Sequence, residues 1–489
     1  MSLAPASANT RASLAAGLAA LLALAGCAQP ETGPIEVSAI GGPPALVDPN
    51  RVPLDAPTAF LTEAVAQGLV RFNAEGDIEP ALAQSWIISD DGLTYTFRLK
   101  RTNWLDGGRV TAQQVAARLR AALTRSSRNP LKPVLGAVSE VVAMTDEVIV
   151  INLRGPRPNF LQLLAHPELA IVQERSGTGP YRLAAFDNGV ARLQILRGED
   201  DEAPADSPPI LLRGEPAMRA VARFAEGRRT LVIGGTAGDL PFARAASPPG
   251  NALVFDNVSG LFGLSFNPRG GPLISAALRQ ALSMAVDRQA LVNALNVPGL
   301  APRTSLVPAG VQDLPNVAQP DWVNMNLAQR QSEARRLIAE LALHGRPSLR
   351  IAMPEGPGYR TIFAYLRRDW RLIGIDAVLA GPGQVADLIF IDEVAPANLG
   401  SWYLRHFTCE VSAICDPAAD TALQDARLAA AANDRQNLLA RADGIFARAT
   451  PFIPLTMPVR WSLVPGRLDG FRPNPFARHP AVNLIAERP

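Results

Sequence analysis

The segment Gly68–Val115, GLVRFNAEGDIEPALAQSWIISDDGLTYTFRLKRTNWLDGGRVTAQQV, combines signals for strands, tight turns and a helix start. Residues Leu93–Leu99 (LTYTFRL) alternate apolar and polar side chains, which predicts a strand with one buried face. The turn-forming residues Asn73–Gly76 predict a hairpin before it. Thr111 is followed three positions later by Gln114, the spacing of a capping box, so a helix is expected to start there.

Further along the chain, strand and helix patterns continue to alternate. Two strand-like stretches, Leu349–Met353 and Ile375–Leu379, flank a predicted helix at Tyr359–Leu372, which favours a parallel strand pair with a right-handed crossover. Ser275–Leu295 predicts one long helix, and the helix around Leu327–Leu343 is expected to end at His344-Gly345. With 489 residues, the chain is expected to form two or three domains of mixed α/β structure.

The N-terminus has the pattern of a secretory signal. Arg11 precedes the apolar run Leu14–Ala25, which is too short for a bilayer that needs about 20 apolar residues. The run ends in LAGC, Leu24 to Cys27, which resembles the signal of bacterial lipoproteins. We therefore expect a signal peptide at residues 1–26, lipid on Cys27 and a tether at residues 27–34. The competing interpretation is an ordinary buried helix.

Composition excludes some classes of function. The formal net charge is only +2, so nothing suggests binding to nucleic acid. Hydrophobic residues make up 48% of the chain and aromatic residues 6%, which is enough for a sizeable core built mainly from aliphatic side chains. The sequence contains no HExxH, GxSxG or GK[ST] motif, and its 4 histidines are scattered, so we expect neither an enzyme, nor a bound metal, nor a cofactor.

Besides Cys27, the only cysteines are Cys409 and Cys415, in the stretch HFTCEVSAIC. In an oxidising compartment they are expected to form a disulfide. Six residues of helix rise about 9 Å, which is too far for a cystine, so the segment has to turn back on itself. The two alternatives are a redox pair, whose usual spacing is CxxC, and a metal site that would add His406 and Asp416.

The chain resembles family 5 of the bacterial extracellular solute-binding proteins, which includes the oligopeptide-, dipeptide- and nickel-binding proteins of ABC importers. The motifs stand in family order and cover nearly all of the chain after the signal segment. They are the opening segment Gly68–Val115, then GTGPY at Gly177–Tyr181, then LSFNPRGGPLISAALRQALSMAVDRQALVNAL at Leu264–Leu295, and FIPLTMPVRWSLVPGRLDGF at Phe452–Phe471.

The resemblance implies a two-lobed periplasmic-binding-protein fold, of type II with an extra subdomain, in which mixed sheets are flanked by helices. Lobe I would comprise residues 35–55, 178–258 and 465–489, with residues 56–177 inserted as a subdomain, and lobe II would comprise residues 259–464. The implied function is capture of a peptide or other small polar solute in the cleft between the lobes. The implied partner is an ABC permease, and the protein would be a monomer held by lipid on the periplasmic side of a membrane.

One departure from the family pattern bears on the ligand. In family peptide binders, the strand resembling Asp387–Ile391 continues into a tryptophan and an aspartate that can pair with a peptide amine. Here Glu393 stands at the place of the tryptophan and Pro396 near that of the aspartate. Asp392 or Glu393 could supply a carboxylate, and both could equally be solvated charges at a strand end. We therefore predict neither a peptide ligand nor nickel specifically.

Further candidates for the cleft follow from position. Phe262 lies in the first expected crossing between the lobes and Met457 in the second, and both could make apolar contacts. Trp402, Tyr403 and Arg405 lie in a predicted loop that could face the cleft. Two other functions stay open: a periplasmic sensor or chaperone-like receptor without transport, and a hydrolase, for which His166 or His406 would have to activate a nucleophile.

Overall fold

The computed structural model describes residues 33–484, apart from 174–175, 197–207, 228–229, 268–271, 342–346, 382, 467 and 469. The predicted signal peptide, Cys27 and the predicted helix end at His344-Gly345 lie outside the described residues. Among those described, none of the helices is both long and apolar enough to traverse a bilayer.

A seven-stranded mixed sheet forms the first part of the molecule, in the order β10-β11-β12-β1-β13-β20-β14. Strand β1 runs parallel to both of its neighbours, whereas β20 is antiparallel to β13 and β14. The helices that accompany it are α2 (Ala56–Val65), α6 (Ala217–Ala225) and α7 (Leu240–Ala245). The strands are β1 (Ile35–Ile40), β10 (Tyr181–Asp187), β11 (Val190–Ile195), β12 (Ile210–Glu215), β13 (Thr230–Thr236), β14 (Leu253–Phe255) and β20 (Arg460–Leu463).

The segment between α2 and β10 forms its own antiparallel sheet, in the order β4-β5-β7-β6. The alternation predicted at Leu93–Leu99 is confirmed, because the side chains of Tyr95, Phe97 and Leu99 are buried in β5. The predicted capping box is confirmed too: Thr111 and Gln114 bond reciprocally at the start of α3. The elements are β2 (Val70–Phe72), β3 (Ile78–Pro80), β4 (Ala83–Ile88), β5 (Thr94–Leu99), α3 (Ala112–Leu123), α4 (Lys132–Leu135), β6 (Val138–Ala143), β7 (Val148–Leu153), α5 (Phe160–Leu164), η1 (Pro167–Leu169), β8 (Val172–Gln173) and β9 (Ser176–Gly177).

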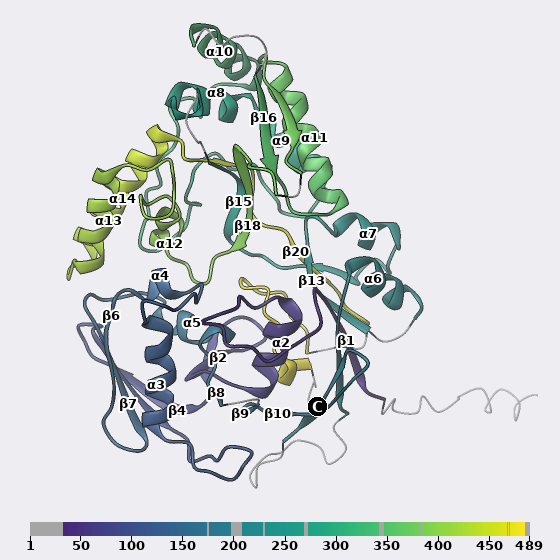
Figure 1. Cartoon of the computed structure of the whole chain (residues 1–489), viewed down its shortest axis with the longest axis vertical. Helices are drawn as coiled ribbons and strands as arrows, with labels where there is room; N and C mark the ends of the chain where they lie inside the picture. The colour runs from purple at the N-terminus through teal and green to yellow at the C-terminus, as the bar shows by residue number, and fades with distance from the viewer. Residues whose placement is uncertain are drawn as a thin grey trace, which may run out of the picture.

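A five-stranded sheet in the order β17-β16-β18-β15-β19 forms the other main part, above the rest in Figure 1. The predicted parallel pair is confirmed, because β16 and β17 run parallel on either side of α11 in the sequence. The elements are β15 (Gly260–Phe266), η2 (Pro272–Ile274), α8 (Ala276–Ala285), α9 (Arg288–Leu295), α10 (Leu327–Glu340), β16 (Ser348–Ala352), α11 (Pro357–Arg371), β17 (Asp376–Leu379), β18 (Leu388–Val394), α12 (Gly400–Arg405), α13 (Pro417–Leu428), α14 (Ala432–Ala449) and β19 (Phe452–Pro454).

The prediction of a single long helix at Ser275–Leu295 is wrong, because the helix ends before Val286 and a second helix follows. Asp287 caps a new helix, α9, by accepting a hydrogen bond from the backbone N–H of Ala290 at 3.0 Å. The backbone N–H of Asp287 itself donates to the carboxylate of Asp369 on α11 at 2.8 Å. A capping aspartate favours the start of a new helix over continuation of the old one. Here the contact with Asp369 on α11 holds the backbone of Asp287 in the position that ends α8 and starts α9.

The chain passes twice between the two large sheets, once between β14 and β15 and once between β19 and β20. Two of the predicted boundaries are therefore wrong. Strand β20 pairs within the seven-stranded sheet, although the family resemblance implies that residues up to 464 belong to the second lobe. Helix α2 packs into the core of that same sheet through Phe60 and Leu61, although the inserted subdomain was expected to begin at residue 56. The mixed α/β fold class is as predicted.

The inserted segment and the helices α12–α14 share one apolar core. Phe97 and Ile149 of the four-stranded sheet belong to the same buried cluster as Phe407 and Phe446 near α12 and in α14. The remaining element, η3 (Ala481–Leu484), lies against the first sheet. Since an apolar core connects them, the inserted segment and α12–α14 are positioned relative to each other by packing.

Candidate ligand-binding cleft

A cavity of about 790 Å³ lies between the two large sheets, within the size range of sites for small ligands. Residues of β13 and β20 form one side, and residues of β15 and β18 form the other. The inserted segment and the C-terminal stretch contribute a further wall. The polar and aromatic side chains that line it are Asp55, His166, Glu168, Thr236, Asp256, Ser265, Glu393, Trp402, Arg405, His406, Arg460, Trp461, Phe476, Arg478 and His479.

Three of the predicted site residues, Glu393, Trp402 and Arg405, line this cavity. Glu393 and His406 lie side by side, with 3.2 Å between the Glu393 Oε2 and His406 Nε2 atoms. His406 Nδ1 lies 2.9 Å from the carbonyl oxygen of Trp402, so both ring nitrogens face acceptors. The hydrogen bond from His406 lowers the pKa of Glu393. This wall therefore presents an ionised carboxylate and a histidine together.

The alternation of β18 separates the two acids between which the sequence could not choose. Glu393 faces the cavity, and Asp392 points to the opposite side of the sheet. There the Asp392 carboxylate accepts hydrogen bonds from Arg460 Nη1 at 2.7 Å and from the Tyr359 hydroxyl at 2.6 Å. Its side chain is only 5% exposed. Asp392 is thus already paired and buried, and it does not line the cavity.

The other three candidates also lie away from this cavity. Phe262 pairs with Asp392 across the strands, and its buried ring packs edge-on against Phe390 at 5.0 Å. Tyr403 is buried in the core, and this burial raises the pKa of its hydroxyl to about 12. Met457 lines a different cavity, of about 820 Å³, formed largely by residues 297–305 and 255–258.

The wall formed by the inserted segment and the C-terminal stretch was not predicted. His166 and Glu168 come from the residues after α5, and Arg478 donates to Glu168 Oε1 at 3.1 Å. Glu168 Oε2 is buried and has no hydrogen-bond partner in the described part of the chain. Its nearest titratable neighbour in this wall is the His166 ring, with 3.8 Å between Glu168 Oε2 and His166 Nδ1. No local motif marks these residues, because they come together only through the fold.

His166 also connects the two walls. Its Nε2 lies 2.7 Å from the carbonyl oxygen of Pro396, and the ring packs against Phe72 and Phe476. Burial lowers the pKa of His166 to about 4, so the ring is neutral at pH 7 and donates from Nε2. The position near which the family peptide binders have an aspartate is thus occupied here by a carbonyl that already accepts a hydrogen bond.

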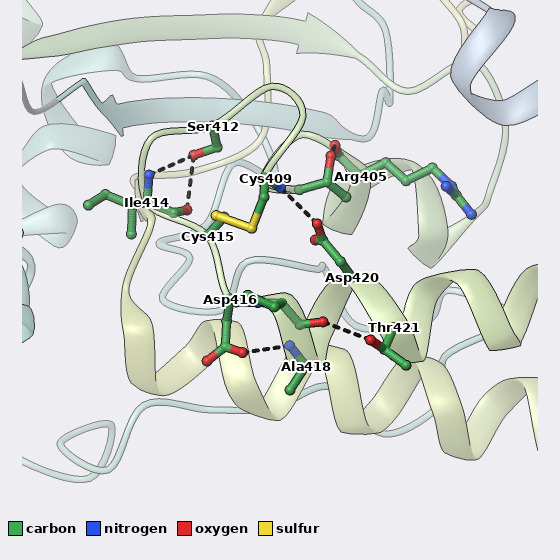
Figure 2. The surroundings of a disulfide bond; sticks show 11 residues. Arg405, Cys409, Ser412, Ile414, Cys415, Asp416, Ala418, Asp420 and Thr421 are labelled. Atoms are coloured by element: carbon green, nitrogen blue, oxygen red, sulfur yellow. Dashed lines mark hydrogen bonds between the residues drawn. A yellow bond between two sulfur atoms is a disulfide. The ribbon is translucent and has the colours of Figure 1, made fainter.

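The two cysteines are joined by a disulfide with a Cα–Cα distance of 5.0 Å. Figure 2 shows that the segment between α12 and α13 turns back on itself, and that the backbone N–H of Cys409 bonds to Asp420 on α13. Val411, at the tip of this loop, lines the cavity, and 66% of its surface is exposed. The disulfide therefore fixes a loop that forms part of the cleft wall. The turn that the spacing of the two cysteines predicts is confirmed.

Neither His166 nor His406 hydrogen-bonds a serine, threonine or cysteine in the described part of the chain, and no group of three metal-binding side chains occurs there.

Comparison with known proteins agrees with this geometry. The model of the bacterial extracellular solute-binding proteins, family 5 Middle, matches residues 77–389, which is more than half of the chain. The chain belongs to this family. The protein is accordingly a solute receptor and not an enzyme.

Two curated relatives illustrate the range of the family. The chain is 21% identical to the periplasmic oligopeptide-binding protein OppA of Haemophilus influenzae, over 88% of this chain and 89% of the relative. It is 26% identical to the nickel-binding periplasmic protein of Escherichia coli, over 69% of this chain and 68% of the relative.

A solved structure supports the fold. The crystal structure of Haemophilus influenzae OppA in complex with the peptide RPPGFSPFR superposes with a TM-score of 0.80 at 20% identity, covering 92% of this chain and 98% of that one. The likeness confirms the predicted periplasmic-binding-protein fold of this solute-binding protein.

Proposed function

We propose that the protein is a substrate-binding lipoprotein of an ABC importer, which captures a peptide or other small polar solute and delivers it to a permease. Membership of the solute-binding family supports this proposal, and so do relatives whose names record oligopeptide, dipeptide and nickel binding. The LAGC motif at Leu24–Cys27 supports lipidation of Cys27 and anchoring on the periplasmic side of a membrane.

The observation that carries the proposal is the cavity between the two large sheets, which both sheets line. A solute in this position contacts Arg460 and Trp461 on one side and Ile391 and Glu393 on the other only when the two sides are close together. Binding therefore shifts the population toward the closed arrangement. The two crossings of the chain, between β14 and β15 and between β19 and β20, are the positions at which a hinge could lie.

The lining also restricts the ligand. Glu168 offers an unpartnered carboxylate oxygen, Glu393 offers a second acceptor, and Arg405 offers a donor on the other side. Trp402 and Trp461 add aromatic surface. The combination suits a solute that carries both hydrogen-bond donors and an acidic group, as peptides do. A bare nickel ion fits less well, since three metal-binding side chains come together nowhere in the described regions.

The proposal is tested by recovering the solute. The chain without its signal peptide is purified, denatured by heat, and the released small molecules are identified by mass spectrometry. The same molecules are then titrated into refolded protein, and small-angle scattering follows compaction. An unchanged solute that rebinds and compacts the protein supports the proposal. Chemical turnover of the solute, or binding without any compaction, would contradict it.

A matched pair of variants tests the site itself. Glu168→Gln removes the charge behind the free acceptor oxygen, and we expect affinity for the recovered solute to fall about tenfold, the loss of one charge-assisted hydrogen bond. Glu140→Gln removes a carboxylate that is exposed on β6, outside the cavity, and is expected to bind like the unaltered protein. Equal affinities for the two variants would exclude Glu168 from the site.

A further inference from the structure

Among the described residues, four arginines line a third, smaller cavity beside the cleft, and we refer to this cavity as the arginine chamber. Arg157 comes from the segment before α5, Arg405 from α12, Arg427 from the last turn of α13 and Arg435 from the first turn of α14. Asp313 provides the only carboxylate that the described residues contribute to its lining.

The protein offsets the positive charge of the chamber only in part: Asp313 acts on Arg157 and Arg435, Asp420 on Arg405, and Glu410 on Arg427. Among the described residues, none of the four arginines has a carboxylate within the 4.0 Å of an ion pair. The carboxylate of Asp313 accepts a hydrogen bond from the backbone N–H of Gly400 at 2.6 Å. Burial lowers the pKa values of Arg157 and Arg405 to about 10, and the neighbouring arginines add to both shifts. Gathering like charges in a buried place is unfavourable unless an anion compensates them.

The guanidinium groups are held in place and still have donors to offer. Arg157 Nη2 donates to the carbonyl of Arg427 at 2.9 Å, and Arg435 Nη1 donates to the carbonyl of Pro156 at 2.9 Å. Arg435 is only 6% exposed, and its Nε has no hydrogen-bond partner in the described part of the chain. A buried N–H of an arginine that lacks an acceptor is costly, which points to a ligand with acceptor atoms.

The size of the chamber limits that ligand. The cavity has a volume of about 20 Å³, against roughly 10–15 Å³ for a single water. This is room for one or two oxygen atoms, so only one edge of a carboxylate or phosphate group fits, and the spacing of its oxygens matches the fork of an arginine. Pro133, Val134 and Arg405 line both this chamber and the cleft, so the two cavities are adjacent.

We propose that the arginine chamber binds the carboxylate or phosphate group of a small anion. The bound group would tie Arg157 of the inserted segment to the three arginines of α12–α14. The anion is either a free ion or the acidic end of a solute lying in the cleft. The second source rests on the proposed function, whereas the first does not depend on it.

Isothermal titration calorimetry at constant ionic strength tests the proposal, with inorganic phosphate as the free ion and hexanoate as an acid whose chain has to lie in the cleft. Arg435→Gln removes the unpartnered donor. Arg441→Gln, at an exposed position on the same helix, removes an equal charge outside the chamber and serves as the control. We expect affinity for at least one probe to fall about tenfold or more in Arg435→Gln and to stay unchanged in Arg441→Gln.

Binding of phosphate indicates a free ion as the source of the anion, and binding of hexanoate indicates the acidic end of a solute in the cleft. Should Arg435→Gln fail to fold, Arg427→Gln removes another chamber charge on a different helix and replaces it in the comparison. Equal responses of the chamber variant and Arg441→Gln, or no binding of either probe, overturn the proposal. Binding of phosphate would support anion binding in the chamber even if no solute could be recovered from the cleft. Failure of the solute-binding proposal is therefore distinguishable from failure of the anion-binding proposal.

Discussion

The buried ion pair between Asp392 on β18 and Arg460 on β20 connects the two large sheets where the chain crosses between them. The Asp392 carboxylate accepts from Arg460 at 2.7 Å and from Tyr359 at 2.6 Å. Replacing Asp392 with alanine leaves the Arg460 charge and the Tyr359 hydroxyl without this partner. Removing one member of a buried pair costs about 3–5 kcal/mol. Because the Arg460 side chain is 16% exposed, and water can solvate it in part, we expect the lower end, about 3 kcal/mol.

Urea unfolding followed by tryptophan fluorescence measures this loss. Glu333→Ala is the control, because Glu333 pairs with Arg336 on the exposed face of α10, where an ion pair contributes less than about 1 kcal/mol. Since Asp392 faces away from the cleft and only its partner Arg460 lines it, we expect the folded variant still to bind the recovered solute. A loss of stability no larger than that of Glu333→Ala would refute the structural role. Loss of solute binding at unchanged stability would instead make Asp392 a ligand contact.

Three further predictions concern titration, the disulfide and the anchor. Burial raises the pKa of Glu63 to about 7, so the folded protein favours the protonated carboxyl, and the stability of the unaltered protein falls as pH rises from about 4.5 through 7. Glu63→Gln does not titrate, so its free energy of unfolding relative to the unaltered protein should increase by roughly 2–3 kcal/mol between pH 5 and pH 8. Urea unfolding at each pH measures this difference. A gain of similar size at both pH values would contradict this. Titration of the unfolded, unreduced protein should find no free thiol at Cys409 and Cys415, and reduction should cost about 2 kcal/mol; two reactive thiols would exclude the bond. Cys27→Ser should move the protein from the membrane fraction to the soluble fraction, and retention in the membrane would count against lipid anchoring.

Features set by neighbouring residues could be predicted from the sequence. The strand at Leu93–Leu99 depends on alternation, and the start of α3 depends on Thr111 and Gln114, so both are found in the structure. The break before α9 was missed, although Asp287 is a strong capping residue, because its partner Asp369 lies on another helix. Sequence patterns predict the helix and strand boundaries that depend on neighbouring residues. Boundaries that depend on residues brought together by the fold cannot be predicted in this way.

Some residues of the candidate site could likewise be placed from the sequence, and others could not. The period of two in β18 could already have separated Asp392 from Glu393, because neighbouring residues of a strand face opposite sides. Pairing with the adjacent strand gives the same answer for Phe262, which lies opposite Asp392 and is buried with it. In contrast, no spacing brings Glu168 and Arg478 together, since they lie 310 positions apart and meet only in the folded chain.

The contact between His166 and Pro396 shows what replaces the missing family aspartate. His166 donates from a neutral ring whose pKa lies near 4, so the bond to the Pro396 carbonyl keeps its character throughout the neutral range of pH. Pro396 itself therefore carries no ionic anchor for a ligand amine, and under the proposed function the charge would come from Glu168 in the cavity lining, which also pairs with Arg478. A ligand amine would then bind on the side of the inserted segment, while Arg405 and the arginine chamber favour an acidic group on the side of α12. The two walls would thus orient a solute with opposite charges at its ends, and they do so without the aspartate used by the family peptide binders.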